Sequence, residues 1–427
     1  MQKNSSTFKR LLDNFLSLSA LQMVNYIVPL LTFPYLVRVL GVEDFGLFSF
    51  VMAVIGYGII ITDYGFDLSA TKHISTNSDN PQKINEIFSS VMVIKSAMAI
   101  LFFLFLLLLV GFVEKFSSHA MLYIYGFGMV LGQVLFPVWF FQGIEKMRYI
   151  TILNALSKAI FAAAIFIFVK SKEDLELVFV FNALGALIAG ALAFNIAVKK
   201  FGVRFSLQSK EQYLFYLKDA WYIFTSRVAV QLYQSLNLII LGFLVSNTLL
   251  GYYAIVEKIV RAGGAILVAL PRALYPYMAK LHQSSIALFY QRNLYLALGL
   301  LAIMIPVAGG VYYLAPEILS LVSGKEHPPA IMIKLLQMLS PLFAVVIFGN
   351  LFTNILVILN ETKLMNKVVV TAGLLNLALV YPTIKYFSVE GLAWLNLFIA
   401  MCVIVMTKGY FIFYHFKKRD VPKHKPS

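Results

Sequence analysis

The sequence predicts an all-α polytopic membrane protein with about twelve transmembrane helices in two six-helix lobes. Three observations predict this class: the composition, a series of long apolar segments, and an uneven distribution of Lys and Arg. Of the 427 residues, 60% are hydrophobic and 13% are charged, whereas soluble domains carry about 25% charged residues. A soluble fold has a largely polar surface, so it could not hide this much apolar surface from water.

The apolar segments account for most of the chain. A transmembrane helix needs about 20 predominantly apolar residues. Twelve segments meet this requirement: 14–37, 46–70, 87–112, 120–142, 149–169, 176–198, 219–245, 250–279, 292–315, 330–359, 366–386 and 390–414. Several contain proline, which membrane helices tolerate when neighbouring groups satisfy the freed carbonyls.

The basic residues predict the orientation. With the N-terminus in the cytoplasm, most Lys and Arg fall in inner loops and tails. The outer side holds only Arg38, Lys115, Lys170, Lys172, Lys325 and Lys385. By the positive-inside rule, we expect both termini to be cytoplasmic. The net charge of +15 therefore reflects topology and contact with anionic lipid rather than nucleic-acid binding.

A weak internal repeat divides the chain into two halves. Gly46-Leu47-Phe48-Ser49 and Gly251-Tyr252-Tyr253-Ala254 each open a helix after a short outer turn. We expect an N-terminal lobe over 1–200 and a C-terminal lobe over 219–416. A basic cytoplasmic linker (201–218) joins them, and a basic tail (417–427) follows. Six helices in each half make the halves parallel repeats with a central cavity between them.

Four cations lie deep inside predicted helices. Lys158 is about ten residues into its segment, hence ~15 Å deep, and Arg227 and Arg261 are similarly deep, with Lys95 somewhat shallower. A charge at the bilayer centre costs at least ~2.5–3.5 kcal/mol, so such residues usually face water or other helices. They predict a water-filled cavity that binds an anion. Ion pairing that holds the helices in register is the alternative.

Three further charges are candidates with two interpretations each. Arg38 closes the first helix at the outer surface, where it either receives a phosphate or anchors the helix at the headgroups. Glu257 precedes Arg261 by four residues, which fits a gate or a local salt bridge. Asp63 lies near the inner end of the second helix, four residues before Asp67. It either binds a coupling ion or marks a solvated helix end.

The sequence contains no catalytic constellation. Walker A and GxGxxG motifs are missing, and no nucleophile–base pair has a supporting domain. The six histidines are scattered and Cys402 stands alone, so we expect no metal site and no bound cofactor. A proton or sodium ion is the candidate coupling ion, and the sequence does not choose between them.

Several motifs resemble one family of membrane transporters. They are Phe33-Pro34-Tyr35-Leu36-Val37-Arg38-Val39-Leu40-Gly41-Val42-Glu43-Asp44-Phe45-Gly46, Asp63-Tyr64-Gly65-Phe66, Phe141-Gln142-Gly143-Ile144-Glu145-Lys146-Met147, Gly251-Tyr252-Tyr253-Ala254-Ile255-Val256-Glu257-Lys258-Ile259 and Leu274-Tyr275-Pro276-Tyr277. Together, and in this order, they resemble the Wzx-type O-antigen flippases. These belong to the polysaccharide-transporter branch of the multidrug/oligosaccharidyl-lipid/polysaccharide exporter superfamily.

This resemblance implies two six-helix lobes around a central cavity and no enzymatic activity. It implies movement of an undecaprenyl-diphosphate-linked oligosaccharide from the cytoplasmic to the periplasmic leaflet, with other polysaccharide-assembly proteins as candidate partners. A capsule or teichuronic repeat unit is an alternative cargo. A small-molecule or drug exporter fits less well because the deep charges are mainly basic. A membrane polymerase or glycosyltransferase usually needs a longer extramembrane loop than this chain offers.

Overall fold

The computed structural model describes residues 2–267, 269–359 and 361–419, and these are entirely helical apart from turns and loops. The chain divides into two compact units, Met1–Gln231 and Leu232–Ser427. The domain boundaries expected from the sequence stay a prediction, and residues 420–427 of the expected tail lie outside the described residues.

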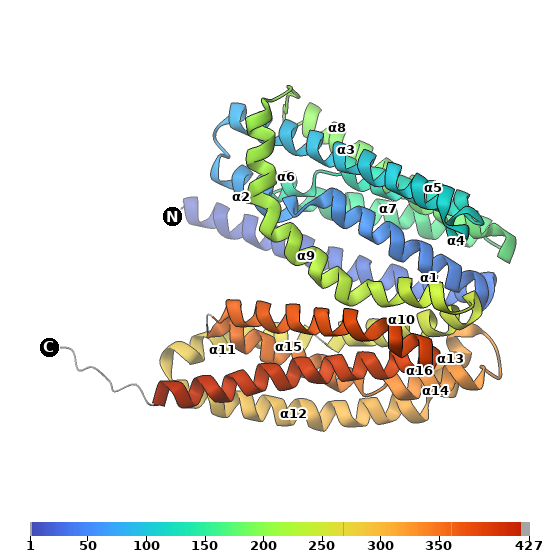
Figure 1. Ribbon diagram of the computed structural model, residues 1–427. Coiled ribbons are helices and arrows are strands. Elements are labelled where there is room, and N and C mark those ends of the chain that lie inside the picture. The colour runs from blue at the N-terminus through green and yellow to red at the C-terminus, as the bar shows by residue number, and fades with distance from the viewer. Residues whose placement is uncertain (1, 268, 360, 420–427) are drawn as a thin grey trace. The chain divides into compact units, whose positions relative to one another are not determined.

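The helices of the first unit begin with a long hairpin. Its elements are α1 (Gln2–Asp63), α2 (Phe66–Thr76), α3 (Pro81–Phe112), α4 (Glu114–Ser117), α5 (Ala120–Leu135), α6 (Val138–Gly143), α7 (Met147–Phe168), the 3-10 turn η1 (Lys172–Asp174), α8 (Leu175–Lys199) and the first part of α9 (Lys210–Leu244). The backbone leaves helical geometry at Gly41 inside α1, and the chain turns back there (Figure 1).

The second unit contains the end of α9 and seven further helices. They are α10 (Asn247–Leu267), α11 (Ala269–Ser284), α12 (Ile286–Tyr313), α13 (Ala315–Ser323), α14 (Ala330–Leu339), α15 (Leu342–Ile358) and α16 (Thr362–Arg419). A second non-helical residue, Ser388, divides α16 into two helical parts.

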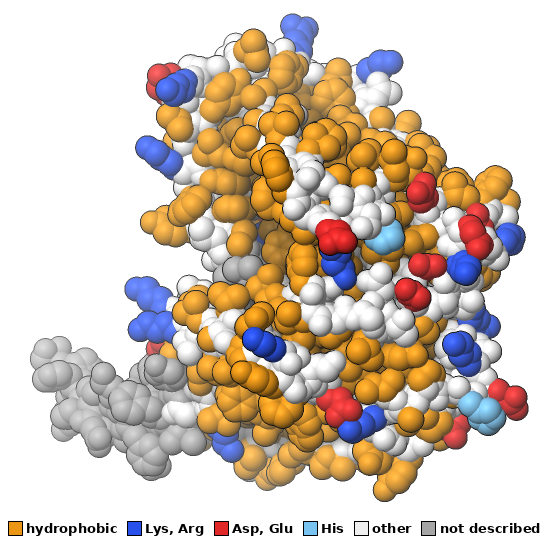
Figure 2. Space-filling view, turned by 45° about the vertical axis from the view of Figure 1, so that its right-hand side comes forward, with side chains coloured by type: hydrophobic (Ala, Val, Ile, Leu, Met, Phe, Trp, Pro, Cys, Tyr) orange, Lys and Arg blue, Asp and Glu red, His pale blue; other side chains and the backbone are white. Residues whose placement is uncertain are grey.

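Eight helical stretches among the described residues are long and apolar enough to span a membrane. Two of them, Leu21–Thr76 and Lys363–Gly409, each hold two of the expected segments, because each contains a kinked hairpin. The segments expected at 219–245 and 250–279 lie on α9, α10 and α11 instead. Hydrophobic side chains cover most of the face shown in Figure 2, and many large ones are exposed, including Leu30, Leu104 and Phe398. The prediction of an all-α polytopic membrane protein is confirmed.

Two expected single helices are broken at proline. The segment 120–142 forms α5 and α6, separated at Phe136 and Pro137, and the segment 330–359 forms α14 and α15, separated at Ser340 and Pro341. Proline lacks the N–H that a continuing helix requires and clashes with the preceding turn. The two expected segments have the predicted lengths, but each forms two helices instead of one continuous helix.

The linker between the expected lobes is partly helical. The helix α9 begins at Lys210, nine residues before the expected start of a membrane segment at 219. Its first turns pack against α2 and α3: Tyr216 is buried and donates a hydrogen bond to Glu86 Oε1 at 2.9 Å. Burial and this carboxylate raise the pKa of Tyr216 above its ordinary value, so the phenol stays protonated as a donor.

The contact between α5 and α8 depends on small residues. A Cβ at Gly132 would lie 2.5 Å from the carbonyl carbon of Ala186, and a Cβ at Gly190 would lie 2.4 Å from the Gly132 carbonyl oxygen. The two backbones therefore approach as closely as glycine allows. Membrane helices lack a hydrophobic driving force between them, and such close packing replaces it.

We predict that Gly132→Ala destabilises the protein by about 1–3 kcal/mol, because the added methyl group meets backbone that cannot move cheaply. The thermal melting temperature in detergent should fall. Gly111→Ala is the matched control, since a Cβ there has nothing within 4 Å. Equal melting temperatures for the two variants would contradict the close-packing account.

Candidate functional site

The candidate site of the first unit is built around a break between α1 and α2. Tyr64 and Gly65 both have positive φ angles, 49° and 78°, so Asp63 ends one helix and Phe66 begins the next. A glycine adopts this conformation without strain. The break turns the chain while it keeps Asp63 and Asp67 close to each other at adjoining helix ends.

The helix α9 lies directly against this break. The ring of Tyr64 stacks on Phe224 with centroids 4.4 Å apart and an interplanar angle of 16°. A Cβ at Gly65 would lie 2.7 Å from Ile223 Cγ2, so only a residue without a side chain permits this approach. Arg227 follows Phe224 by three residues, one helical turn further on, and therefore faces the two carboxylates.

Four charged side chains meet at this point, and we call Asp63, Asp67, Lys95 and Arg227 the charge cluster. Lys95 Nζ lies 3.5 Å from Asp63 Oδ1 and donates to the carbonyl oxygen of Gln133 at 3.4 Å. Arg227 Nη1 lies 3.4 Å from Asp63 Oδ2, and Nη2 donates to Asp67 Oδ2. Asp63 thus bridges the two cations.

The members of the charge cluster differ in burial. The side chain of Lys95 is 1% exposed and that of Asp63 is 14% exposed, whereas that of Arg227 is 41% exposed. A buried charge needs a partner of opposite sign, and Asp63 supplies it for Lys95. Arg227 has solvent-accessible surface as well as its two carboxylates, so it is the member that another anion can reach.

Asp67 is only partly satisfied. Its Oδ2 accepts from Arg227, while its Oδ1 is buried and has no hydrogen-bond partner among the described residues. Asp67 also lies in the first turn of α2, where the helix dipole favours a negative charge. It is the carboxylate of the cluster with an oxygen available to a proton or a cation.

The remaining deep cation of the first unit has a neutral partner. Lys158 on α7 donates to Asn25 Oδ1 on α1 at 2.6 Å. An amide stabilises an ammonium group by a hydrogen bond but leaves its charge uncompensated. Lys158 therefore differs from Lys95 and Arg227, whose charges face carboxylates.

The other expected residues lie elsewhere. In the second unit, Arg261 Nη2 and Glu257 Oε1 form an i,i+4 ion pair at 2.8 Å, and the Arg261 side chain is 50% exposed. Arg38 is exposed on α1, three residues before the kink at Gly41. Among the predicted residues, only Asp63, Lys95 and Arg227 therefore come together in one cluster within the described residues.

The second unit holds a buried amide network. Asn237 Nδ2 donates to Asn376 Oδ1 at 3.3 Å and to Asn396 Oδ1 at 3.1 Å, and Asn376 returns a hydrogen bond to Asn237 at 2.7 Å. Asn396 donates to the hydroxyl oxygen of Tyr253. These bonds link α9, α10 and both parts of α16. They are the interhelical bonds expected of asparagines in membrane helices.

Sequence reasoning missed three features of these sites. The first is the direct contact between Asp67 and Arg227, although the four-residue spacing from Asp63 had already singled out Asp67. The carbonyl of Gln133 and the amide of Asn25 were the others, and no local pattern identifies them as partners of a lysine. Within the described part of the chain, no group of three or more His, Cys, Asp or Glu residues has the arrangement of a metal site.

We predict strong coupling between Asp63 and Lys95. Asp63→Asn removes the carboxylate beside a buried ammonium group, which costs about 3–5 kcal/mol when a buried pair loses one partner. The double variant Asp63→Asn/Lys95→Met should recover most of this loss, because the uncompensated charge is gone. Melting temperatures of the two single variants and the double variant in detergent measure the coupling. Additive losses would show that the two residues do not interact.

Sequence comparisons show the family of the chain. Residues 11–282 match the family model described as "Polysaccharide biosynthesis protein". A protein of Escherichia coli (strain K12) named "Putative O-antigen transporter" is 30% identical over 417 residues, covering 96% of this chain and 98% of that protein. A protein of the same name from Shigella dysenteriae is 24% identical, covering 92% and 98%. The resemblance to Wzx-type flippases is confirmed.

Solved structures show the same fold at low identity. An inward-facing multidrug resistance MATE family transporter has a TM-score of 0.70 at 14% identity and covers 97% of this chain and 100% of its own. The lipid II flippase MurJ in an inward closed conformation has a TM-score of 0.71 at 13% identity, covering 92% and 86%. The relatives are named transporters, and the chain is an integral membrane transporter rather than an enzyme. It belongs to the polysaccharide biosynthesis protein family.

Proposed function

We propose that the protein moves an undecaprenyl-diphosphate-linked oligosaccharide, the O-antigen repeat unit, from the cytoplasmic to the periplasmic leaflet of the bacterial inner membrane. Both termini are cytoplasmic in this proposal, as the distribution of Lys and Arg predicts. The observation that carries it is the similarity, over nearly the whole of both chains, to the Escherichia coli protein named "Putative O-antigen transporter". The charge cluster supports a mechanism for recognising the diphosphate.

Arg227 is the group that we expect to bind the diphosphate. A guanidinium presents two parallel N–H groups that match phosphate oxygens as well as carboxylate oxygens. In the charge cluster these groups contact Asp63 and Asp67, and the partly exposed side chain leaves a path for an incoming anion. The phosphate replaces one carboxylate at Arg227 in this mechanism, so no cation has to lose its partner inside the membrane.

The displaced carboxylate provides a means of coupling. When a phosphate takes its place, Asp67 or Asp63 becomes a buried charge with fewer partners, and binding a proton or a sodium ion relieves this cost. Asp63 also holds Lys95, so Asp67 is freer to change its partner. Glu257 and Arg261 form the second ion pair that we propose to open and close as a gate in alternating access.

Lys158 is proposed as an electrostatic contributor to substrate binding. Its hydrogen bond to Asn25 orients the ammonium group without neutralising it. The remaining positive charge favours an anion near α1 and α7. Arg38, at the predicted outer end of the first helix, is proposed to meet the diphosphate after it has crossed.

The function is tested in vesicles that contain the purified protein and a labelled undecaprenyl-diphosphate oligosaccharide. We expect protein-dependent movement of the label between leaflets, and a folded protein that moves none would overturn the proposal. The same vesicles loaded with a capsule-type repeat unit or a cationic drug test the alternative cargoes. If either one is transported faster than the O-antigen unit, then that molecule is the substrate in place of the O-antigen unit.

We predict that Arg227→Gln lowers transport by tenfold or more, and that Arg227→Lys restores it only partly because a lysine lacks the planar fork. Arg148→Gln is the matched control, since it removes an exposed arginine of the same unit at the start of α7. Initial rates are compared at equal protein content. If Arg227→Gln transports at the wild-type rate, Arg227 has no role in the mechanism. This result would not contradict the proposed identity of the transported substrate.

Lys158→Ala and Arg261→Ala test the wider prediction that deep cations favour the substrate. We expect each to raise the substrate concentration at half-maximal rate by about tenfold or more, because loss of a hydrogen bond to a charged group costs about 1.5–3 kcal/mol and about 1.4 kcal/mol corresponds to a factor of ten. Lys158→Arg keeps the charge and should retain more activity than the alanine variant. Full transport by both alanine variants would show that these cations do not act on the diphosphate.

A further inference from the structure

The segment that leads into α9 exposes four large apolar side chains, and we call them the linker surface. They are Phe205, Leu207, Leu214 and Phe215, which are 53%, 81%, 42% and 53% exposed. All four precede residue 219, where the next membrane segment is expected to begin. The spanning part of the chain therefore does not account for them. Segments that face water usually present polar side chains instead.

The first turns of α9 are apolar on two opposite faces. One face packs inward, where Tyr216 and Ala220 are buried in a core cluster with side chains of α2 and α3. The other face carries Leu214 and Phe215, and Lys218 follows Leu214 on the next helical turn. Packing against α2 and α3 explains the first face only. The outer face needs an apolar surrounding of its own, because a helix in contact with water is polar on its outer side.

Hydrogen bonds hold the linker at the level where α3 enters the membrane. The backbone N–H of Arg204 donates to Asn85 Oδ1 at 2.8 Å, and that of Ser206 donates to Ser89 Oγ at 3.0 Å. Asn85 and Ser89 lie on either side of residue 87, where the spanning segment is expected to begin. The linker therefore meets α3 at the membrane surface rather than above it.

The first part of α9 crosses from one helix end to another. The Tyr216 hydroxyl bonds Glu86 in the second turn of α3, and Asp219 Oδ2 lies 3.0 Å from His73 Nε2 in the last turn of α2. Figure 1 shows this part of α9 at a steep angle to α3. A helix that crosses the ends of membrane-spanning helices lies along the membrane surface rather than through it.

The charges around the linker surface fit anionic headgroups. Residues 204–218 contain three basic side chains, Arg204, Lys210 and Lys218, and all three are exposed. Glu211 is the one acidic residue of this range. Large apolar side chains interleaved with Lys and Arg are typical of segments that lie in the membrane interface. Basic residues at this level are attracted to the anionic lipids of the cytoplasmic leaflet.

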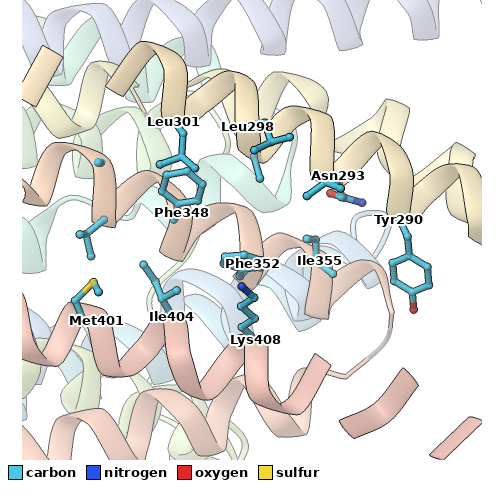
Figure 3. Close-up of a pocket in the computed structure, with 14 residues that line it drawn as sticks. Tyr290, Asn293, Leu298, Leu301, Phe348, Phe352, Ile355, Met401, Ile404 and Lys408 are labelled. Atoms are coloured by element: carbon cyan, nitrogen blue, oxygen red, sulfur yellow. The ribbon is translucent and has the colours of Figure 1, made fainter. Parts of the chain in front are cut away.

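Apolar surface among the spanning helices has a different composition. A groove of about 790 Å³ in the second unit lies between α12, α15 and the second part of α16, and side chains such as Leu298, Phe348 and Ile404 line it. Lys408 is the one charged side chain among the described residues that line the groove, and Figure 3 shows it directed toward Phe352. This composition suits hydrocarbon chains. The linker surface has three basic residues beside four apolar ones, which suits the headgroup region.

We propose that the linker surface is an anchor that lies in the headgroup region of the cytoplasmic leaflet. Its four apolar side chains insert among the upper parts of the acyl chains, and the three neighbouring basic residues contact anionic phospholipid headgroups. The anchor sets the depth at which α9 enters the membrane, and α9 carries Arg227. It does not depend on the identity of the transported substrate.

Nitroxide labels measure the depth of the linker surface in vesicles that contain the full chain. Cys402 is the single cysteine, so a Cys402→Ala background accepts one label at Leu207→Cys or at Phe215→Cys. Power saturation compares collisions with oxygen, which concentrates in lipid, and with an uncharged nickel chelate, which stays in water. The references are Leu104→Cys, on an exposed position within the span of α3, and Ser78→Cys, in the exposed turn before α3.

We expect the oxygen-to-nickel collision ratio at both linker positions to lie severalfold above that of the Ser78→Cys label and below that of the Leu104→Cys label. Ratios equal to that of the Ser78→Cys label would place the linker surface in water and overturn the proposal, as would protection of both labels from oxygen and nickel alike by a bound protein. Neither result requires transport, so the proposed function is tested separately.

The basic residues are tested by changing the lipid. When phosphatidylglycerol replaces part of the phosphatidylcholine, the ratio at Leu207→Cys should rise by about twofold or more, because each basic residue gains an anionic partner. The triple variant Arg204→Gln/Lys210→Gln/Lys218→Gln should lose this rise. Lys170→Gln, which removes an exposed lysine on the predicted outer side, should keep it. An unchanged rise in the triple variant would overturn the role of anionic headgroups.

Discussion

A charged side chain inside a membrane-spanning bundle must meet an opposite charge or water, and this requirement organises the first unit. Lys95 is almost fully buried among helices whose outer faces are apolar. Asp63, the last residue of α1, compensates it across the contact between α1 and α3. Three other features contribute to this arrangement of charges: the break at Tyr64 and Gly65, the close approach of α9, and the position of Arg227.

This arrangement changes how the deep basic residues are interpreted. A cavity lined by uncompensated cations would bind an anion strongly, but it would also be costly to fold. Pairing Lys95 and Arg227 with carboxylates lowers that cost. Anion binding at Arg227 then becomes an exchange of partners. An exchange is easier to reverse than a simple capture, and a transporter has to release what it binds.

Much of the fold was predictable from the sequence, for a physical reason. Lipid requires every spanning segment to be helical and apolar, so long apolar runs and the positions of Lys and Arg predict an all-α polytopic protein. The breaks at Pro137 and Pro341 were less certain, because a membrane helix can either continue through a proline or end at it. The continuous helices around Pro29 and Pro306 show the other outcome.

The site was predictable only in part. Depth along a helix marked Lys95, Arg227 and Lys158 as unusual, and spacing marked Asp63 with Asp67. Depth says nothing about rotation around the helix axis or about which helix lies opposite. The partner of Lys95 therefore depended on the packing of α1 against α3, and the partner of Lys158 on the packing of α7 against α1. No local pattern of residues predicts either of these partners.

The pairing of Asp63 with Lys95 also bears on how the protein is made. Asp63 precedes Lys95 in the chain, so the carboxylate has already been synthesised when the helix that carries the lysine enters the membrane. Insertion of that helix can proceed with its charge compensated from the start. Arg227 arrives only after six further helical elements. The early pair therefore leaves Asp67 as the one charge of the cluster without a cation, and Arg227 supplies that cation when α9 is in place.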